Sequence, residues 1–200
     1  RSPSRGLGDV YKRQVEHDIL ILADDIYGRL VYNGNTFTPI SSLSDAIRKQ
    51  TIVINGVSKT YAMTGWRVGF AVGEPEIISG MAKIISQTTS NLTSVSQYAA
   101  IEALTGDQSS IEEMRKAFEE RLNTIYPLLA EVPGFEVIKP QGAFYLFPNV
   151  KKAMEIKGYT DVNDFTNAIL EEAEVALVTG AGFGAPENIR LSYATDLDIL

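Results

Sequence analysis

The chain has 200 residues with one histidine and no cysteine, and its 18 basic and 25 acidic side chains leave a net charge of −7. These counts exclude a disulfide framework and argue strongly against a metal site, and the acidic balance without a basic stripe argues against nucleic-acid binding. Because no apolar run approaches the roughly 20 residues of a membrane helix and none reads as a signal peptide, we expect a cytoplasmic protein that spans no membrane.

The residue patterns at both ends of the chain differ from that of its middle. Residues 1–14 are rich in basic residues, glycine and serine and lack a helical period, so we expect a non-native or disordered segment, with a native flexible terminus as the alternative. At the other end, Thr195 or Asp196 is placed to cap a helix that stops within its first turn. Both features suggest a fragment of a longer protein.

The first part of the chain alternates between strand and helix patterns. Apolar runs predict strands at 19–23, 51–55 and 67–72, and residues 75–104 have a helical period with a break of small residues at 90–94. Such alternation predicts an α/β fold with a largely parallel first sheet.

A long helix is predicted over Ser109–Ala130, because apolar residues recur there at helical spacing and Pro133-Gly134 follows. Beyond this helix the elements become shorter, and the boundary between two domains is expected near it. We expect a helix at 161–173 and strands at 135–138, 144–147, 175–178 and 189–194.

The most informative stretch is GVSKTYAMTGWRVG, residues 56–69, which follows a buried strand. It contains Lys59 and Arg67. Lysine amines form Schiff bases with carbonyl cofactors, and arginine holds phosphate through two parallel hydrogen bonds. Taken alone, however, Lys59 also fits a solvated surface lysine and Arg67 an exposed ion pair.

Asp24 and Tyr27 directly follow the first predicted strand, in the sequence ADDIY. In open α/β sheets, ligand groups collect at the carboxyl ends of the strands. Asp24, Tyr27 and Lys59 are therefore expected to converge on one crevice, although Asp24 alone would also fit a loop or capping acid.

Position by position, residues 56–69 resemble the lysine signature of class I aminotransferases that use pyridoxal phosphate (PLP), and the chain is similar to their aspartate-aminotransferase-like branch. The resemblance extends from about Val15 to Leu200. It implies the C-terminal half of such an enzyme. Residues 15–125 would be part of the large PLP-binding domain, with a mostly parallel sheet and helices, and residues 126–200 a smaller α+β domain that is truncated at its end.

The resemblance implies a role for each candidate residue. Lys59 would form the Schiff base with PLP and later move a proton on the substrate, while Asp24 would pair with the pyridine nitrogen. Tyr27 would hydrogen-bond the phenolic oxygen of PLP, and Arg67 would hold its phosphate. Arg190, in the sequence NIRLSYA, would bind the substrate's α-carboxylate; the alternative is an exposed arginine on an edge strand.

Some positions depart from the family pattern or carry weaker signals. The family often has a hydroxyl residue at the position of Gly56 as a further phosphate ligand, so that contact is in doubt here. Residues 142–145, GAFY, match a family strand, and we expect their aromatic side chains mainly in the core. The glycine-rich residues 180–184 are expected to form a flexible loop that leads to Arg190.

The resemblance implies PLP-dependent transamination between an amino acid, with aspartate or an aromatic residue favoured, and a 2-oxo acid such as 2-oxoglutarate. A PLP-dependent β-lyase on the same fold, and an aminotransferase-like effector domain of a transcription regulator, stay open as alternatives. Because family members are about twice this length and share active sites across a dimer, we expect a homodimer when full length and poor activity from these 200 residues alone.

Overall fold

The computed structural model describes residues 7–200, which divide into two compact units. The first unit contains the described residues up to Arg29 together with Thr36–Glu112, and the second contains Leu30–Asn35 and Glu113–Leu200. The boundary between the units therefore lies at Glu112–Glu113, near the start of the predicted long helix. The boundary expected from the sequence, at residue 125, lies further along the same helix. None of the helices in residues 7–200 is both long and apolar enough to cross a membrane.

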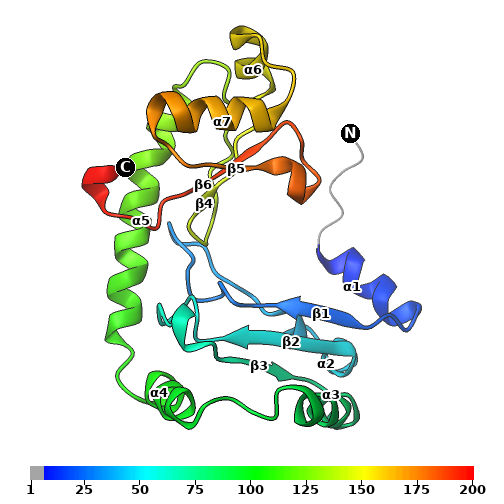
Figure 1. Cartoon of the computed structure of the whole chain (residues 1–200). Coiled ribbons are helices and arrows are strands. Elements are labelled where there is room, and N and C mark those ends of the chain that lie inside the picture. Colours follow the sequence, from blue (N-terminus) through cyan, green and yellow to red (C-terminus); the bar gives the residue numbers. More distant parts are fainter. Residues whose placement is uncertain (1–6) are drawn as a thin grey trace. The chain divides into compact units, whose positions relative to one another are not determined.

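The first unit is built around a three-stranded sheet with the order β1-β2-β3 (Figure 1). Strands β1 and β2 are parallel, with Asp24 opposite Ile54, and β3 runs antiparallel to β2, with Gly69 opposite Gly56. The α/β pattern was thus predicted, but only one of the two strand pairs is parallel. The elements of this unit are α1 (Leu7–Glu16), β1 (Ile21–Asp24), η1 (Ile40–Ser42), α2 (Asp45–Gln50), β2 (Thr51–Gly56), η2 (Thr64–Trp66), β3 (Gly69–Val72), α3 (Pro75–Thr88) and α4 (Ser94–Thr105).

Part of the segment expected to be disordered is a helix, because α1 begins at Leu7 and ends at Glu16. Within α1, residues 9–16 hold no glycine or proline, and Arg13 lies in the last turn, where a positive charge interacts favourably with the helix dipole. The structure therefore has a helix over residues 7–14, where the sequence suggested a non-native or disordered segment, while residues 1–6 lie outside the described residues. That the segment is non-native stays a prediction.

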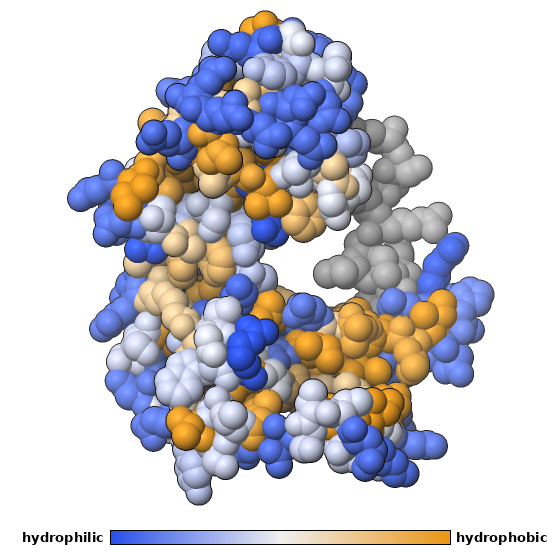
Figure 2. All heavy atoms as spheres, in the orientation of Figure 1, coloured by the Kyte–Doolittle hydropathy of each residue, from blue (hydrophilic) through white to orange (hydrophobic). Residues whose placement is uncertain are grey.

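Both faces of the first sheet carry exposed apolar side chains. Leu22 points to the same side as its partner Ile52, whereas Val72 points to the opposite side with its partner Val53. Leu22 is 71% exposed and Val72 is 60% exposed. Figure 2 shows hydrophobic residues reaching the surface around this sheet.

The second unit combines short antiparallel strands, in the order β4-β6-β5, with helices (Figure 1). Its core is a cluster of buried apolar side chains from α6, α7 and β6, which includes Met154, Phe165 and Ile189. Helix α5 starts in the first unit and belongs to the second from Glu113 onward. The elements are α5 (Ser109–Ala130), β4 (Tyr145–Leu146), α6 (Lys151–Lys157), α7 (Val162–Ala173), β5 (Val178–Thr179), η3 (Gly180–Phe183), β6 (Ile189–Ser192) and η4 (Leu197–Ile199).

The predicted strand at 135–138 is not a regular strand in the structure. Only Glu136 is bridged, through two backbone hydrogen bonds of 2.9 Å with Asn149, and Ile138 is 90% exposed. A regular strand needs a neighbouring strand to accept and donate its backbone hydrogen bonds, and this segment has such a partner only at Glu136. The apolar pattern alone therefore predicted a longer strand than the structure contains. At the C-terminus, Asp196 caps the 3₁₀ turn η4 as expected, accepting a hydrogen bond from the N–H of Asp198 at 3.0 Å.

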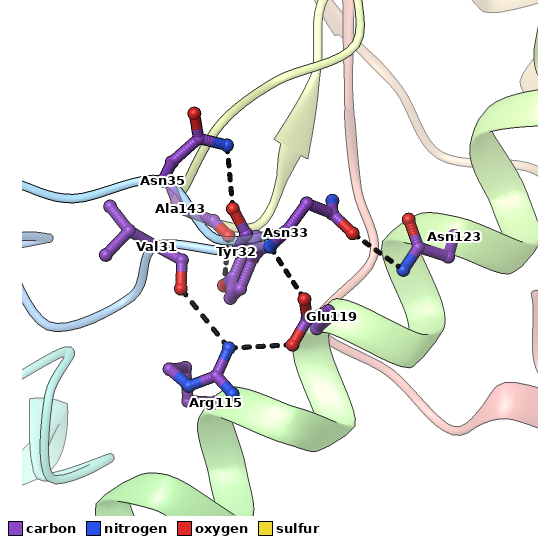
Figure 3. Close-up of polar contacts among 8 residues, drawn as sticks. All are labelled: Val31, Tyr32, Asn33, Asn35, Arg115, Glu119, Asn123 and Ala143. Carbon is purple, nitrogen blue, oxygen red and sulfur yellow. Dashed lines mark hydrogen bonds and ion pairs between the residues drawn. The ribbon is translucent and has the colours of Figure 1, made fainter.

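The short segment Leu30–Asn35 belongs to the second unit although the chain on either side of it belongs to the first. The Tyr32 ring is fully buried, and its hydroxyl donates a hydrogen bond to the carbonyl of Ala143. The N–H of Asn33 donates to Oε1 of Glu119 on α5 at 2.6 Å (Figure 3). These contacts anchor the segment firmly against α5 and the turn before β4.

Candidate functional site

One edge of the first sheet gathers four of the five residues predicted from the sequence. Parallel strands β1 and β2 end at this edge, with Asp24 opposite Ile54, and antiparallel β3 begins at it. Asp24 is thus the last residue of β1, Lys59 lies just beyond β2, and Arg67 lies just before β3. Ends of neighbouring strands that share an edge place their following side chains close together.

Tyr27 and Lys59 meet at this edge, since Lys59 Nζ lies 5.9 Å from the centre of the Tyr27 ring. Both side chains are half-buried. A cation within about 6 Å of an aromatic ring is attracted by it. The structure therefore brings together the amine and the phenol whose convergence the sequence predicts.

Asp24 is exposed, and its neighbour Asp25 is partly buried. Asp24 Oδ1 accepts a hydrogen bond from the N–H of Ile26 at 3.2 Å, so this acid does serve the turn. Burial, and secondarily the nearby charge of Asp24, raise the pKa of Asp25 above its usual value. Of the two acids, Asp24 is therefore the more exposed to solvent at the sheet edge.

The loop that carries Lys59 is held by hydrogen bonds to its own backbone. The carbonyl of fully buried Val57 accepts from the N–H of Tyr61 at 3.2 Å, and Thr64 Oγ1 donates to the carbonyl of Ser58 at 3.0 Å. These hydrogen bonds on both sides of Lys59 fix where its side chain starts. The position of the amine is thus set by the fold of the loop.

Arg67 adopts a left-handed backbone conformation, with φ 56° and ψ 46°, at the end of η2. The expected strand therefore begins at Gly69 and not at Arg67, because this conformation cannot continue a strand. The exposed Arg67 guanidinium donates to the carbonyl of Thr64 at 3.0 Å. Within residues 7–200 it has no acidic partner, so the alternative of a surface ion pair is not what the structure contains.

Gly56 has no space for a side chain. A Cβ atom at this position would lie 2.7 Å from the carbonyl oxygen of Val68 and 3.1 Å from the Cα of Gly69, because Gly56 pairs directly with Gly69 at the start of β3. The hydroxyl that the family often carries here would therefore require β3 to move. The close approach of two backbones explains the glycine.

Arg190 lies in the second unit, on β6, opposite Val178 of β5. Because β6 is the central strand of its sheet, the alternative of an arginine on an edge strand is wrong. Its guanidinium carbon lies 4.6 Å from the centre of the Tyr145 ring and 4.8 Å from that of Phe183. In the part of the chain that the structure describes, no acidic side chain pairs with Arg190.

The sequence did not predict the two rings beside Arg190. Tyr145 was expected in the core, and Phe183 within a flexible loop. The sequence carries only a weak signal for these two rings, because their closeness to Arg190 depends on how β4, β6 and η3 pack together.

The chain matches the family model for class I and II aminotransferases over residues 3–198. It is 72% identical over 205 residues to the asparagine–oxo-acid transaminase of Streptococcus mutans serotype c, covering 98% of this chain and 52% of that protein. With the aspartate aminotransferase of Bacillus subtilis (strain 168) it shares 52% identity, covering 100% of this chain and 53% of the relative. The chain thus spans about half the length of these curated relatives.

A solved structure gives the same result for the fold. The aromatic aminotransferase from Pyrococcus horikoshii OT3 matches with a TM-score of 0.89 and 34% identity, covering 98% of this chain and 52% of that one. The α/β fold and the resemblance predicted from residues 56–69 are confirmed. The chain belongs to the class I and II aminotransferases, a family whose members depend on PLP.

Proposed function

We propose that this chain holds PLP at the edge of the β1-β2-β3 sheet and contributes to the transfer of an amino group from asparagine or aspartate to a 2-oxo acid. The observation that carries the proposal is the meeting of Lys59 and Tyr27 at this edge, where Nζ lies 5.9 Å from the ring centre. Asp24 and Arg67 stand at the same edge.

The groups present at the edge fit PLP. An amine, a carboxylate, a phenol and a guanidinium complement its aldehyde, pyridine nitrogen, phenolic oxygen and phosphate. Asp24 is exposed, and Arg67 has no acidic partner among residues 7–200, so both are available to a ligand. The left-handed backbone of Arg67 supports the assignment, because strained backbone is retained where the side chain has a use.

When bound, PLP supplies an electron sink for the charge that develops on the substrate's Cα. Asp24 would hold the proton of the pyridine nitrogen, and Tyr27 would donate a hydrogen bond from its hydroxyl to the phenolic oxygen. Arg67 would grip the phosphate with parallel N–H donors. Lys59 would bind the aldehyde through Nζ, and with substrate in place the same Nζ would act as the base that moves a proton from Cα.

Arg190 would bind the α-carboxylate of the substrate, because a half-buried guanidinium without an acidic partner in the described residues suits an external anion. The name of the relative at 72% identity, asparagine–oxo-acid transaminase, supports asparagine or aspartate as the amino donor. We include 2-oxoglutarate as acceptor, a homodimer and a cytoplasmic location in the same proposal. These rest on the family resemblance.

Borohydride reduction tests the cofactor site. The chain is incubated with PLP, reduced, digested and mapped by mass spectrometry. We expect the cofactor on the peptide that contains Lys59, and we expect the Lys59→Ala variant to lose it. Lys83→Ala, which removes an exposed lysine from α3 of the same unit, is the matched control and should label normally. Equal labelling of the Lys59→Ala chain would contradict the proposal.

Product analysis of the complete enzyme separates transamination from the β-lyase alternative. We expect asparagine or aspartate and 2-oxoglutarate to give glutamate and the corresponding 2-oxo acid. With β-chloroalanine, whose Cβ carries a chloride leaving group, pyruvate with free ammonia would instead indicate elimination. If an enzyme that binds PLP at Lys59 catalyses neither reaction, the result would favour the effector domain of a transcription regulator.

A further inference from the structure

Two aromatic rings contact the guanidinium of Arg190, although neither belongs to the site predicted from the sequence. The guanidinium carbon lies 4.6 Å from the centre of the Tyr145 ring and 4.8 Å from that of Phe183. All three residues belong to the second unit. A guanidinium is planar and stacks on aromatic faces, and its N–H donors lie in its own plane.

The sheet explains the position of Tyr145. Strands β4 and β6 are antiparallel, with Tyr145 opposite Ser192. Arg190 precedes Ser192 by two residues and therefore points to the same face, as a diagonal neighbour of Tyr145. Diagonal neighbours lie within reach when one side chain is aromatic and the other is long. The ring reaches Arg190 through strand register.

The turn before β6 explains the position of Phe183. This glycine-rich segment, expected to be a flexible loop, is the 3₁₀ turn η3. Thr179 caps it by accepting a hydrogen bond from the N–H of Ala181 at 3.1 Å, and Gly184 ends it with φ 72°. Phe183 also meets Phe147 edge to face, with ring centres 6.0 Å apart. The segment expected to be a flexible loop thus has regular 3₁₀ structure.

We propose that Tyr145 and Phe183 are positioning residues, whose rings hold the guanidinium of Arg190 in one orientation so that its N–H donors are presented to a carboxylate. The choice of ligand rests on the proposed function. Within residues 7–200 no acidic side chain pairs with Arg190. The rings therefore orient the cation without competing for the hydrogen bonds that a substrate carboxylate needs. Arginine otherwise has many rotamers, and fixing them beforehand favours binding.

The first test measures the binding of 2-oxoglutarate to the 200-residue chain by NMR titration. Phe183→Leu removes the aromatic face and keeps an apolar side chain, and we expect it to weaken binding about tenfold. Phe183→Trp should restore binding because it restores the face. Tyr126→Leu is the matched control, since it removes the ring over which Lys139 Nζ lies at 5.5 Å in the same unit. This control should bind like the unmodified chain.

The second test needs no ligand. The mobility of the Arg190 side chain is measured from the heteronuclear relaxation of its Nε–H signal. We expect a rigid signal in the unmodified chain and a mobile one in Phe183→Leu and in Tyr145→Leu, each checked for folding by its thermal midpoint. Equal mobility in all three chains would overturn the proposal, as would unchanged 2-oxoglutarate binding in Phe183→Leu.

The two tests also separate this proposal from the proposed function. If the rings restrict Arg190 but no chain binds 2-oxoglutarate, the positioning role stands and the assignment of Arg190 to the substrate carboxylate fails. If Phe183→Leu and Phe183→Trp weaken binding equally, the aromatic face is not what matters and the positioning role fails.

Discussion

Arg67 combines an unfavourable backbone with a side chain that suits an anion. For an L-residue, the left-handed region costs roughly 1–2 kcal/mol, and glycine avoids most of this cost. Arg67 nevertheless occupies it, with φ 56°, directly before β3. Among the described residues, its guanidinium makes one hydrogen bond, to the carbonyl of Thr64. Backbone strain and anion binding can therefore be separated by mutation at this single position.

We expect Arg67→Gly to bind PLP about 10- to 100-fold more weakly, because charge-assisted hydrogen bonds are lost. The thermal midpoint should not fall, since relief of strain offsets the lost bond to Thr64. Absorbance titration with PLP and thermal unfolding provide the two measurements. Ser90→Gly is the matched control, because Ser90 is an exposed residue of the same unit with φ 63°. It should gain the same backbone relief without a change in PLP affinity; wild-type affinity in Arg67→Gly would contradict the assignment.

The sequence predicted the residues of the sheet edge better than those around Arg190. Lys59 and Arg67 lie in one short stretch, and Asp24 and Tyr27 follow a strand, so local spacing was enough to bring them together. Tyr145 and Phe183 reach Arg190 only through the register of β4 on β6 and the turn η3. Register between segments distant in the chain depends on packing that no local pattern reports.

Helix α7 begins at a cap that titrates. Asp161 Oδ1 accepts hydrogen bonds from the N–H groups of Asn163 at 2.6 Å and Asp164 at 3.4 Å. These bonds, led by the one from the backbone of Asn163, lower the pKa of Asp161 below its ordinary value of 3.8. A carboxyl group with a lower pKa in the folded state stabilises the fold above its unfolded pKa. That contribution is lost as the pH falls through the folded pKa.

We therefore expect Asp161→Ala to lower the thermal midpoint of the chain at neutral pH, and the deficit to shrink in acid below the ordinary pKa of an aspartate. Asp161→Asn should keep the midpoint at neutral pH, because asparagine caps helices as well as aspartate does. It should also lack the part of the acid dependence that Asp161 contributes. Midpoints measured by circular dichroism across acidic and neutral pH test this. A deficit that stays constant with pH would show that the charge is irrelevant.

Helices were predictable in proportion to their length. Helix α5 has the predicted bounds, Ser109–Ala130, because its apolar period repeats over several turns. The shorter helices α2 and α6 were not predicted, because six or seven residues hold too few turns to show a period. Their caps were the available signals. Ser44 accepts from the N–H of Ile47, and Gly158 ends α6 with φ 80°.

At the scale of the whole molecule, the first unit leaves apolar surface uncovered. Helix α4 mixes apolar and polar residues around its circumference; Ala100 is its one buried residue, and Tyr98 is 74% exposed. Leu22 and Val72 are exposed on opposite faces of the sheet. Large apolar side chains left exposed on a helix, and strands that read as continuous apolar runs, indicate surface that further protein normally covers. The chain spans about half the length of its curated relatives.

We expect the 200-residue chain on its own to self-associate and to bind the dye ANS, because exposed apolar patches of this kind drive association. Light scattering coupled to size exclusion gives the mass. The double variant Leu22→Thr, Val72→Thr should associate less, while Leu128→Thr, on the exposed side of α5 in the second unit, serves as control. A monodisperse monomer without ANS binding would contradict this expectation.

The anchored segment Leu30–Asn35 has a consequence for how this protein could be divided or recombined. The chain leaves the first unit after Arg29, returns to it at Thr36 and leaves it again after Glu112. Residues 113–200, expressed alone, would therefore lack Leu30 and Tyr32, whose side chains are fully buried in the intact chain. A crossover between related genes placed in α5 would inherit the segment from one parent and the helix that binds it from the other. The hydrogen bond from the N–H of Asn33 to Glu119 would then join segments from two different parents, so the two parental sequences must be compatible at this contact.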